Sequence, residues 1–367
     1  MTREQAKQAI LTALKDCHVP QRSHFILPKV EKRPRNPGEF YPLEARQKGE
    51  QAVLNMSSLE DSLGNLRFLH VRQAFPLKPD AELIDVATHL AQSFVFAPAS
   101  LNGSPVAYWT QIPVWFILTD VGGPTGSLLN QDRWLALLDK ANTGDVPSIE
   151  LSGYVVELVG HEAGLTEPEA LSLLVDSALD GADYARMQLY RDLTACSSGS
   201  LVDAWVSADA QAGSAEAELT LAQTLYTKML SSGSDAGQTA KISELLHRVA
   251  DSPDKFYQLW AAGVLATEPG LRDPAVALKV ATALNAQPDA GHERDPDYAE
   301  LLAAARAANG QFASAVNSEL TAIEWARHRG WNLKSMQSRL ATYRAQRPWF
   351  GHLCDCQQIA PDSDVGL

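Results

Sequence analysis

Residues 40–56 read FYPLEARQKGEQAVLNM, and proline and glycine in this stretch predict its local structure. Pro42 and Gly49 bracket a short helix, because proline suits the first turn of a helix and glycine suits the position just after its end. Residues 51–58 alternate weakly between apolar and polar side chains, which is typical of a strand. Gly64 then marks a turn, so the sequence predicts a second strand that returns beside the first as a hairpin.

Residues 94–118 read FVFAPASLNGSPVAYWTQIPVWFIL and predict the rest of the same unit. Just before them, residues 80–93 carry apolar side chains at helical spacing. Asn102 and Gly103 form a turn dipeptide, and residues 106–118 follow it as one long strand. The predicted order is therefore helix, strand, strand, helix, strand, which is an α+β arrangement.

The two quoted stretches resemble the C-terminal domain of TonB-type energy transducers. The matching residues, which fall in the order and spacing of that family, are Tyr41, Pro42, Ala45, Arg46, Gly49, Gly64, Phe96, Pro98, Ala99, Gly103, Pro105, Val106, Pro113 and Phe116. The resemblance implies an αββαβ domain over residues 38–120. The family commonly has a second glycine where this chain has Gln51, and a working transducer needs a membrane helix and a long proline-rich span that this sequence lacks. We therefore expect the fold and the binding surface of the family rather than energy transduction.

The last predicted strand is where we expect partner contacts. Members of the resembled family meet short extended peptides of outer-membrane receptors by strand addition, and an exposed edge strand has the unpaired backbone groups that this mode needs. Pro113 interrupts the row of backbone donors in this chain. The candidate partner-binding residues are Val106, Tyr108, Trp109 and Trp115 on this strand and Trp260 and Trp325 in the second half of the chain. The last two either anchor a partner or fill gaps between helices.

The second half of the chain has the composition of packed helices. Residues 1–120 contain 12 alanines and residues 201–320 contain 27, and alanine is the best helix former. Gly144, Gly181 and Gly213 lie 37 and 32 residues apart, a period that is typical of stacked helix pairs. The pattern resembles degenerate Sel-type or tetratricopeptide (TPR) repeats, and this resemblance implies an all-α repeat solenoid.

The chain is thus predicted to hold two folded parts. The predicted boundaries are a short helix and a basic, proline-rich linker at 1–37, the TonB-like domain at 38–120, a glycine-rich linker at 121–127, the solenoid at 128–348 and a flexible tail at 349–367. Because solenoid repeats contact mainly their neighbours, we expect residues 38–120 to fold on their own.

Charge and hydropathy narrow the class of partner. The 367 residues carry a formal net charge of −13, although residues 1–50 hold 10 basic and 6 acidic side chains. An acidic chain disfavours nucleic acid and anionic membranes, so we expect protein or peptide partners. No apolar stretch approaches the length of a membrane-spanning helix, and the start lacks a secretory signal. The TonB resemblance implies the periplasm, whereas the missing signal favours the cytoplasm; we prefer the periplasm.

No catalytic motif is complete. His161 and Glu162 begin a zincin-like pattern, but Leu165 stands where that pattern needs its second histidine. The sequence also has no Gly-x-Ser-x-Gly nucleophile elbow. We therefore predict no catalytic residue, cofactor or metal, and a non-enzymatic interaction or scaffold protein of the bacterial cell envelope. Two alternatives stay open: a cytoplasmic assembly adaptor, and a hydrolase with its site between the two parts.

The tail contains one group of reactive side chains. His352, Cys354 and Cys356 lie within five residues. Such a group can hold a copper or zinc ion or form a strained disulfide. A free tail is the simplest expectation.

Overall fold

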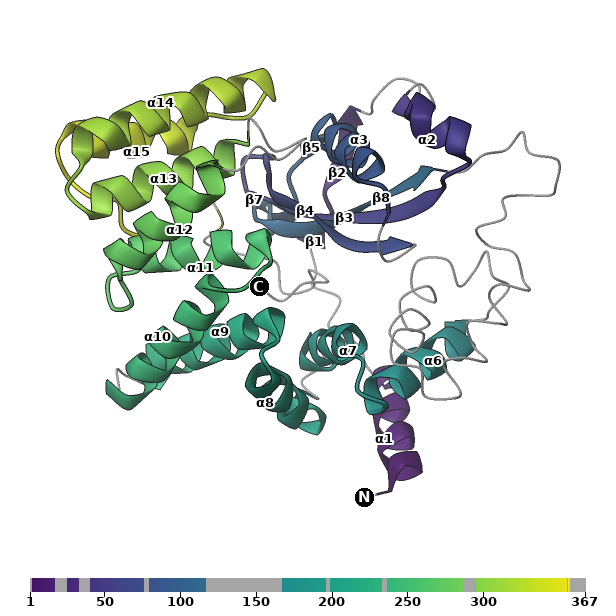
Figure 1. Ribbon diagram of the computed structural model, residues 1–367. Coiled ribbons are helices and arrows are strands. Elements are labelled where there is room, and N and C mark those ends of the chain that lie inside the picture. The colour runs from purple at the N-terminus through teal and green to yellow at the C-terminus, as the bar shows by residue number, and fades with distance from the viewer. Residues whose placement is uncertain are drawn as a thin grey trace.

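The computed structural model describes residues 2–16, 25–32, 40–75, 79–116, 167–195, 199–232, 236–286, 295–354 and 356. Its elements, in chain order, are α1 (Arg3–Lys15), β1 (Phe25–Ile26), β2 (Lys29–Lys32), α2 (Leu43–Lys48), β3 (Ala52–Glu60), β4 (Leu66–Phe75), α3 (Ala81–Gln92), β5 (Val95–Ala97), β6 (Ser100–Leu101), β7 (Ser104–Pro105), β8 (Tyr108–Phe116), α6 (Glu167–Leu179), α7 (Asp183–Ala195), the 3-10 helix η3 (Gly199–Leu201), α8 (Asp203–Ala212), α9 (Ala215–Ser232), α10 (Ala236–Ala250), α11 (Lys255–Thr267), α12 (Pro274–Ala286), α13 (Pro296–Ala308), α14 (Phe312–His328) and α15 (Lys334–Arg344). Figure 1 shows a sheet unit, formed by β1–β8 with α2 and α3, followed by the helices α6–α15, which we call the helical array. The prediction of a small α+β region followed by helices is confirmed at this level.

The centre of the sheet unit is an antiparallel sheet with the strand order β4-β3-β8. Helix α3 covers one face of this sheet, where its residues Leu83 and Leu90 share a buried cluster with Leu54 and Ile112 of the strands. The order α2, β3, β4, α3, β8 matches the predicted helix, strand, strand, helix, strand, with three short strands inserted before the last one.

Glycine is required at the turn between β3 and β4. The φ angle of Gly64 is +82°, and a Cβ atom at this position would lie 2.8 Å from the backbone oxygen of Phe96. Gly49, with a φ of +72°, ends α2, and Asn102 and Gly103 both adopt positive φ between β6 and β7. The turns predicted at these positions are therefore confirmed.

Residues 25–32 belong to the sheet unit and do not form a linker. Strand β1 pairs with β6, and β2 pairs with β5, so these backbone groups are satisfied within the sheet unit. Helix α1 packs on the start of the helical array, where Ile10 is buried and the Lys7 Nζ atom lies 2.5 Å from Asp176 Oδ2. The short helix predicted at the start of residues 1–37 is present as α1, whereas the predicted linker is corrected for residues 25–32.

Two of the three predicted repeat glycines lie between helices of the array. Gly181 separates α6 from α7 with a φ of +103°, and Gly213 separates α8 from α9 with a φ of +92°. Gly144, the predicted linker at 121–127 and the solenoid residues 128–166 lie outside the described residues. From α8 onward most contacts of each helix are with the helices next to it in the chain, although α11 also packs on α13.

The sheet unit and the helical array share one hydrophobic core. Leu59, Phe68 and Trp109 from the three central strands are buried together with residues of α9–α13. Figure 1 shows the array curving along the sheet on the side away from α2 and α3. A separate sheet unit would expose these side chains to water, so the packing argues against the expected independent folding of residues 38–120.

The start of the predicted flexible tail is packed. Leu353, Cys354 and Cys356 are buried in the shared core, against residues of α11. The expectation of a flexible segment from residue 349 onward is therefore corrected for residues 349–354 and 356.

Candidate functional site

The site is organised around Phe68, which has an unusual backbone conformation. Its φ is +55°, which bulky residues rarely adopt, and it lies where the β3–β4 register shifts between Ser57 and Leu59. Asp297 of α13 enforces this conformation, since its Oδ2 accepts the Phe68 backbone N–H at 2.5 Å. A strained residue of this kind costs on the order of 1–3 kcal/mol, and such residues cluster at functional sites.

Phe68 is part of an aromatic cluster that joins the sheet to α11. We define this cluster as Phe68, His70, Trp109, Phe256 and Trp260. The ring centroids of Phe68 and Trp260 lie 4.9 Å apart in an edge-to-face arrangement, and those of His70 and Phe256 lie 3.8 Å apart and are stacked. Pairs of this geometry add stability beyond the burial of area, so the cluster fixes the sheet against the array.

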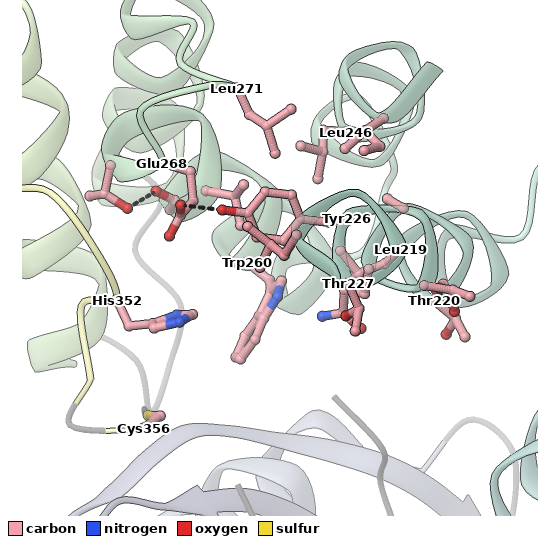
Figure 2. A pocket seen from close by; sticks show the side chains of 18 of the residues that line it. Leu219, Thr220, Tyr226, Thr227, Leu246, Trp260, Glu268, Leu271, His352 and Cys356 are labelled. Carbon is pink, nitrogen blue, oxygen red and sulfur yellow. Dashed lines mark hydrogen bonds between the residues drawn. The ribbon is translucent and has the colours of Figure 1, made fainter. Parts of the chain in front are cut away.

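A cavity of about 610 Å³ lies beside this cluster, between α9, α11 and the tail. Its apolar wall contains Phe68, Leu219, Leu246, Leu259, Trp260, Val264 and Leu271. Figure 2 shows Trp260 lying between α9 and the tail residue His352. The size and the largely apolar lining are those of a ligand pocket.

Helix α9 contributes a polar wall to the cavity. Thr220, Gln223, Thr224 and Thr227 follow the i, i+3, i+4, i+7 spacing of one helix face and all line the cavity. Thr220 is buried, whereas Thr227 is exposed at the rim. The cavity therefore has hydroxyl and amide groups on one side and the apolar side chains of α11 on the other.

A hydrogen bond connects the two helices across the cavity. The Tyr226 hydroxyl donates to Glu268 Oε2 at 2.8 Å, as Figure 2 shows. Burial, together with this hydrogen bond and the charge of Glu268, raises the pKa of Tyr226 to about 12. The hydroxyl therefore keeps its proton at neutral pH and acts as a fixed donor.

The tail forms a further wall of the cavity. His352, Leu353, Cys354 and Cys356 all line it, and the two cysteines form a disulfide with a Cα–Cα distance of 5.2 Å. The three possibilities left by the sequence are thus resolved in favour of the disulfide, because sulfurs joined to each other are not thiolate ligands for a metal.

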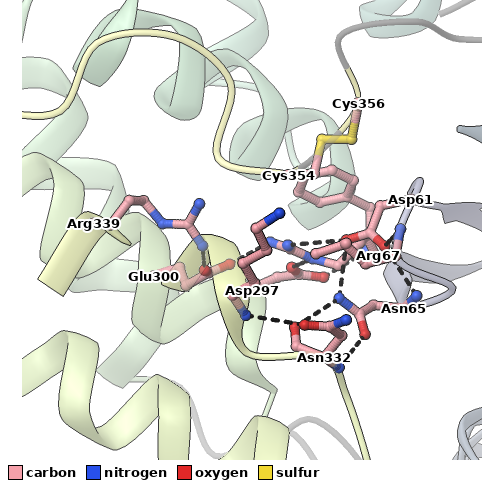
Figure 3. A network of polar contacts seen from close by, with 12 residues as sticks. Asp61, Asn65, Arg67, Asp297, Glu300, Asn332, Arg339, Cys354 and Cys356 are labelled. Atoms are coloured by element: carbon pink, nitrogen blue, oxygen red, sulfur yellow. Dashed lines mark hydrogen bonds and ion pairs between the residues drawn. A yellow bond between two sulfur atoms is a disulfide. The ribbon is translucent and has the colours of Figure 1, made fainter. Parts of the chain in front are cut away.

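Behind the cavity wall, a buried charge network joins the sheet unit to the array (Figure 3). We define this network as Asp61, Arg67, Asp297, Glu300, Glu319 and Arg339. The Nε atom of Arg67 donates to Asp297 Oδ1 at 2.5 Å, one of its NH groups donates to Glu300, and another lies 3.8 Å from Asp61 Oδ2. Arg67 thereby connects three carboxyl groups from β3–β4 and α13.

Arg339 of α15 extends the network through the array. It contacts Glu300 and donates to Glu319 Oε1 at 3.3 Å, and only 1% of its side chain is exposed. Beside the network, Asn65 and Asn332 exchange two hydrogen bonds, one of them from the Asn332 N–H to Asn65 Oδ1 at 2.7 Å. These two bonds fix the β3–β4 turn beside the segment before α15, although the two asparagines lie 267 positions apart in the chain.

Carboxyl groups outnumber arginines in the charge network. Burial raises the pKa of Asp61, Asp297 and Glu319, although the Arg67 charge opposes the rise in each case. Burial also lowers the pKa of Arg339 to about 9, which leaves it charged at neutral pH. The network therefore retains protons more tightly than exposed carboxylates do.

The structure does not gather the predicted partner-binding residues of the last strand into a free surface. Val106 and Trp109 are each 1% exposed, so their side chains pack inside the protein. Tyr108 and Trp115 are half-buried, and Tyr108 packs near Phe25 with ring centroids 6.0 Å apart. Strand β8 does lie at one edge of the described β4-β3-β8 sheet, as predicted.

The two tryptophans predicted in the helical half differ in their surroundings. Trp260 is half-buried, belongs to the aromatic cluster and lines the cavity. Trp325 is half-buried against Met336 and Leu340 between α14 and α15. Of the two, the structure places Trp260 in the candidate site.

Sequence reasoning missed Arg67, Phe68 and the charge network. Arg67 resembles an ordinary outward-facing strand residue, and its partners on α13 lie 230 and 233 positions away. No local pattern in the sequence predicts such a contact.

Comparison with family models, curated proteins and solved structures gave no match to this chain. Within the described segments, no helix is long and apolar enough to cross a membrane. In the same segments, no group of three or more histidine, cysteine, aspartate or glutamate side chains is arranged to hold a metal ion. The candidate site is therefore defined by its own geometry: an apolar cavity, an aromatic cluster and a buried charge network behind them.

Proposed function

We propose that this chain is a non-enzymatic binding or scaffold protein that holds an apolar segment of a partner protein in the cavity. The observation that carries the proposal is the cavity of about 610 Å³, with Trp260 and leucines on one wall and the threonine–glutamine row of α9 on the other. Apolar side chains of a segment fit the first wall, and the hydroxyl and amide groups of the second wall suit its backbone groups.

The charge of the chain bears on the class of partner. With a net charge of −13, the protein attracts basic segments and repels acidic ones, and a neutral segment meets no repulsion. The resemblance to TonB C-terminal domains supports a place in the bacterial cell envelope, in the periplasm, and β8 as a second contact strand. The resemblance to Sel-type and TPR repeats supports the peptide-binding role of the array. The alternative is a cytoplasmic adaptor, and cell fractionation distinguishes the two by showing whether the protein is found in the periplasm or in the cytoplasm.

We do not adopt the hydrolase alternative. The titratable groups between the sheet unit and the array, such as Arg67 and Glu300, are 0–1% exposed and ion-paired to each other. A substrate would have to break these pairs to reach them, at a cost of several kcal/mol.

Site-specific photo-cross-linking in intact cells tests the proposed cavity. We place a benzophenone amino acid at exposed Thr227, on the cavity rim, and at exposed Ser338 on α15 as the control. The expected result is one protein captured from position 227 and not from position 338.

The variant Gly263→Leu provides the matched cavity-filling control. Gly263 lines the cavity, and a Cβ atom there would lie at an ordinary contact distance of 3.8 Å from the Leu353 Cδ1 atom, without a backbone clash. Gly263→Leu should abolish the cross-link from position 227 while the melting temperature is retained. Capture of the same proteins from both positions, or capture that survives Gly263→Leu, contradicts the proposal.

A further inference from the structure

The disulfide in the cavity wall has a placement that does not suit a structural cross-link. Cys354 and Cys356 are separated by one residue, so the bond joins two neighbouring points of one segment and not two elements of the fold. A disulfide stabilises a protein mainly by restricting its unfolded chain, and this effect decreases with the length of the closed loop. A loop with a single intervening residue gives close to the minimum effect.

Other contacts anchor the tail segment without the disulfide. Leu353 is buried in the shared core, and the Gly351 N–H donates to the Thr267 backbone oxygen at 3.4 Å. The guanidinium of Arg272 lies over the Phe350 ring, 5.0 Å from its centroid. We therefore expect the segment to stay in place when the bond is broken.

Both sulfur-bearing residues line the cavity, although they are only 6% and 4% exposed. Large thiol proteins cannot reach sulfurs buried to this degree without rearrangement, whereas a small dithiol, or a cysteine on a segment held in the cavity, approaches them from the cavity side. A disulfide that small thiols can reach, and that contributes little to the fold, can exchange without unfolding the protein, since exchange needs an attacking thiolate with access to a sulfur.

We propose that Cys354–Cys356 is a redox-active disulfide that accepts two electrons from a dithiol entering the cavity. One thiolate of the dithiol attacks a sulfur of the pair, so that a mixed disulfide forms and the other cysteine leaves as a thiolate and takes up a proton. The second thiol of the dithiol, deprotonated, then attacks the mixed disulfide, which releases the oxidised dithiol and the second protein thiol. Two electrons and two protons move from the dithiol to Cys354 and Cys356. This activity goes beyond the proposed binding function and does not depend on it.

A redox titration of the folded protein tests the proposal. The variant Cys17→Ser/Cys196→Ser leaves the pair as the only cysteines of the chain. After air oxidation it is incubated with dithiothreitol, or with glutathione buffers of graded ratio, and alkylated for mass spectrometry. We expect both cysteines to gain the label together, with an unchanged circular dichroism spectrum. Free thiols after air oxidation, or reduction only at denaturant concentrations that unfold the protein, would overturn the proposal.

Two further variants test the route and the intermediate. Gly263→Leu narrows the cavity beside Leu353 and should slow reduction by dithiothreitol at least tenfold, whereas Ser338→Arg on α15 should leave the rate unchanged. In the same cysteine background, Cys354→Ser or Cys356→Ser should trap a mixed disulfide with glutathione. Equal rates in Gly263→Leu and Ser338→Arg exclude the cavity route, and failure of both serine variants to form the adduct excludes exchange at these sulfurs. Neither experiment needs the partner protein, so their failure is distinct from failure of the cross-linking test.

Discussion

Replacement of Arg67 by methionine tests whether the charge network holds the sheet against the array. Arg67→Met keeps an unbranched apolar stem, shorter than that of arginine, and removes the charge and the hydrogen-bond donors. In the native protein Arg67 donates to Asp297 and Glu300, its charge lies 3.8 Å from Asp61 Oδ2, and its side chain is 1% exposed. The variant therefore leaves carboxyl groups buried without their main counter-charge.

The expected loss in the free energy of unfolding follows from the burial of these carboxyl groups. Removing one partner of a buried ion pair costs about 3–5 kcal/mol, because the remaining charge is left without compensation. Protonation of one buried carboxyl group removes part of this cost in the variant. The free energy of that protonation falls by about 1.4 kcal/mol for each unit by which the pH is lowered. We therefore expect a loss of about 3–5 kcal/mol at pH 8 and a loss smaller by at least about 1.4 kcal/mol at pH 5.

Urea unfolding, followed by tryptophan fluorescence and circular dichroism at both pH values, measures these losses. The control is Lys279→Met, because Lys279 and its partner Asp251 are 75% and 71% exposed and their 3.4 Å pair lies at the surface, where such pairs contribute about 0–1 kcal/mol. If Arg67→Met costs no more than Lys279→Met at pH 8, or costs the same at both pH values, the network does not have the role assigned to it.

Two further predictions concern the sheet and the aromatic cluster. Burial, reinforced by the charge of Asp61, raises the pKa of Glu60 from 4.5 to about 8, so the folded protein holds a proton that the unfolded chain releases. The stability that this proton contributes is complete below about pH 4.5 and is lost as the pH rises toward 8. In urea titrations at several pH values, Glu60→Gln should therefore show a smaller decrease in the free energy of unfolding over this range. The same pH profile in the variant and in the native protein contradicts the assignment. Trp260→Ala should lower the free energy of unfolding by about 2 kcal/mol, less than a fully buried tryptophan would, and should also abolish the cross-link from the cavity rim. Trp325→Ala should destabilise the protein by a similar amount and leave the cross-link intact, and equal effects of the two variants on the cross-link would show that neither residue is an anchor.

The elements of the sheet unit could be predicted because their signals are local. Gly49 and Gly64 adopt the positive φ angles that glycine permits, and Asn102 and Gly103 do the same at the next turn. Each of these residues specifies its turn without reference to distant parts of the chain. Helix α3 was predicted from the spacing of its apolar side chains, and Asp80 caps it through a hydrogen bond from the Glu82 N–H at 2.8 Å.

The candidate site could be predicted only in part, because most of it is made of long-range contacts. Trp260 was identified from its residue type, but its position in the cavity depends on Phe68, 192 positions earlier. Asp297 has the sequence signature of an acidic residue in the first turn of a helix, which is a common exposed feature. In the structure its carboxylate is instead buried against Arg67, and only the packing of α13 on β4 determines this.

Phe68 connects the charge network to the cavity, because its backbone contacts the first and its ring lines the second. Its ring forms part of the cavity wall and packs on Trp260, while its backbone N–H donates to the same Asp297 carboxylate that pairs with Arg67. The ring can keep its place only while Asp297 stabilises the strained backbone at φ +55°. Loss of charge on Asp297 or Arg67 therefore acts on the cavity without any change in the residues that line it, and the buried network sets the shape of the binding site as well as the position of the sheet.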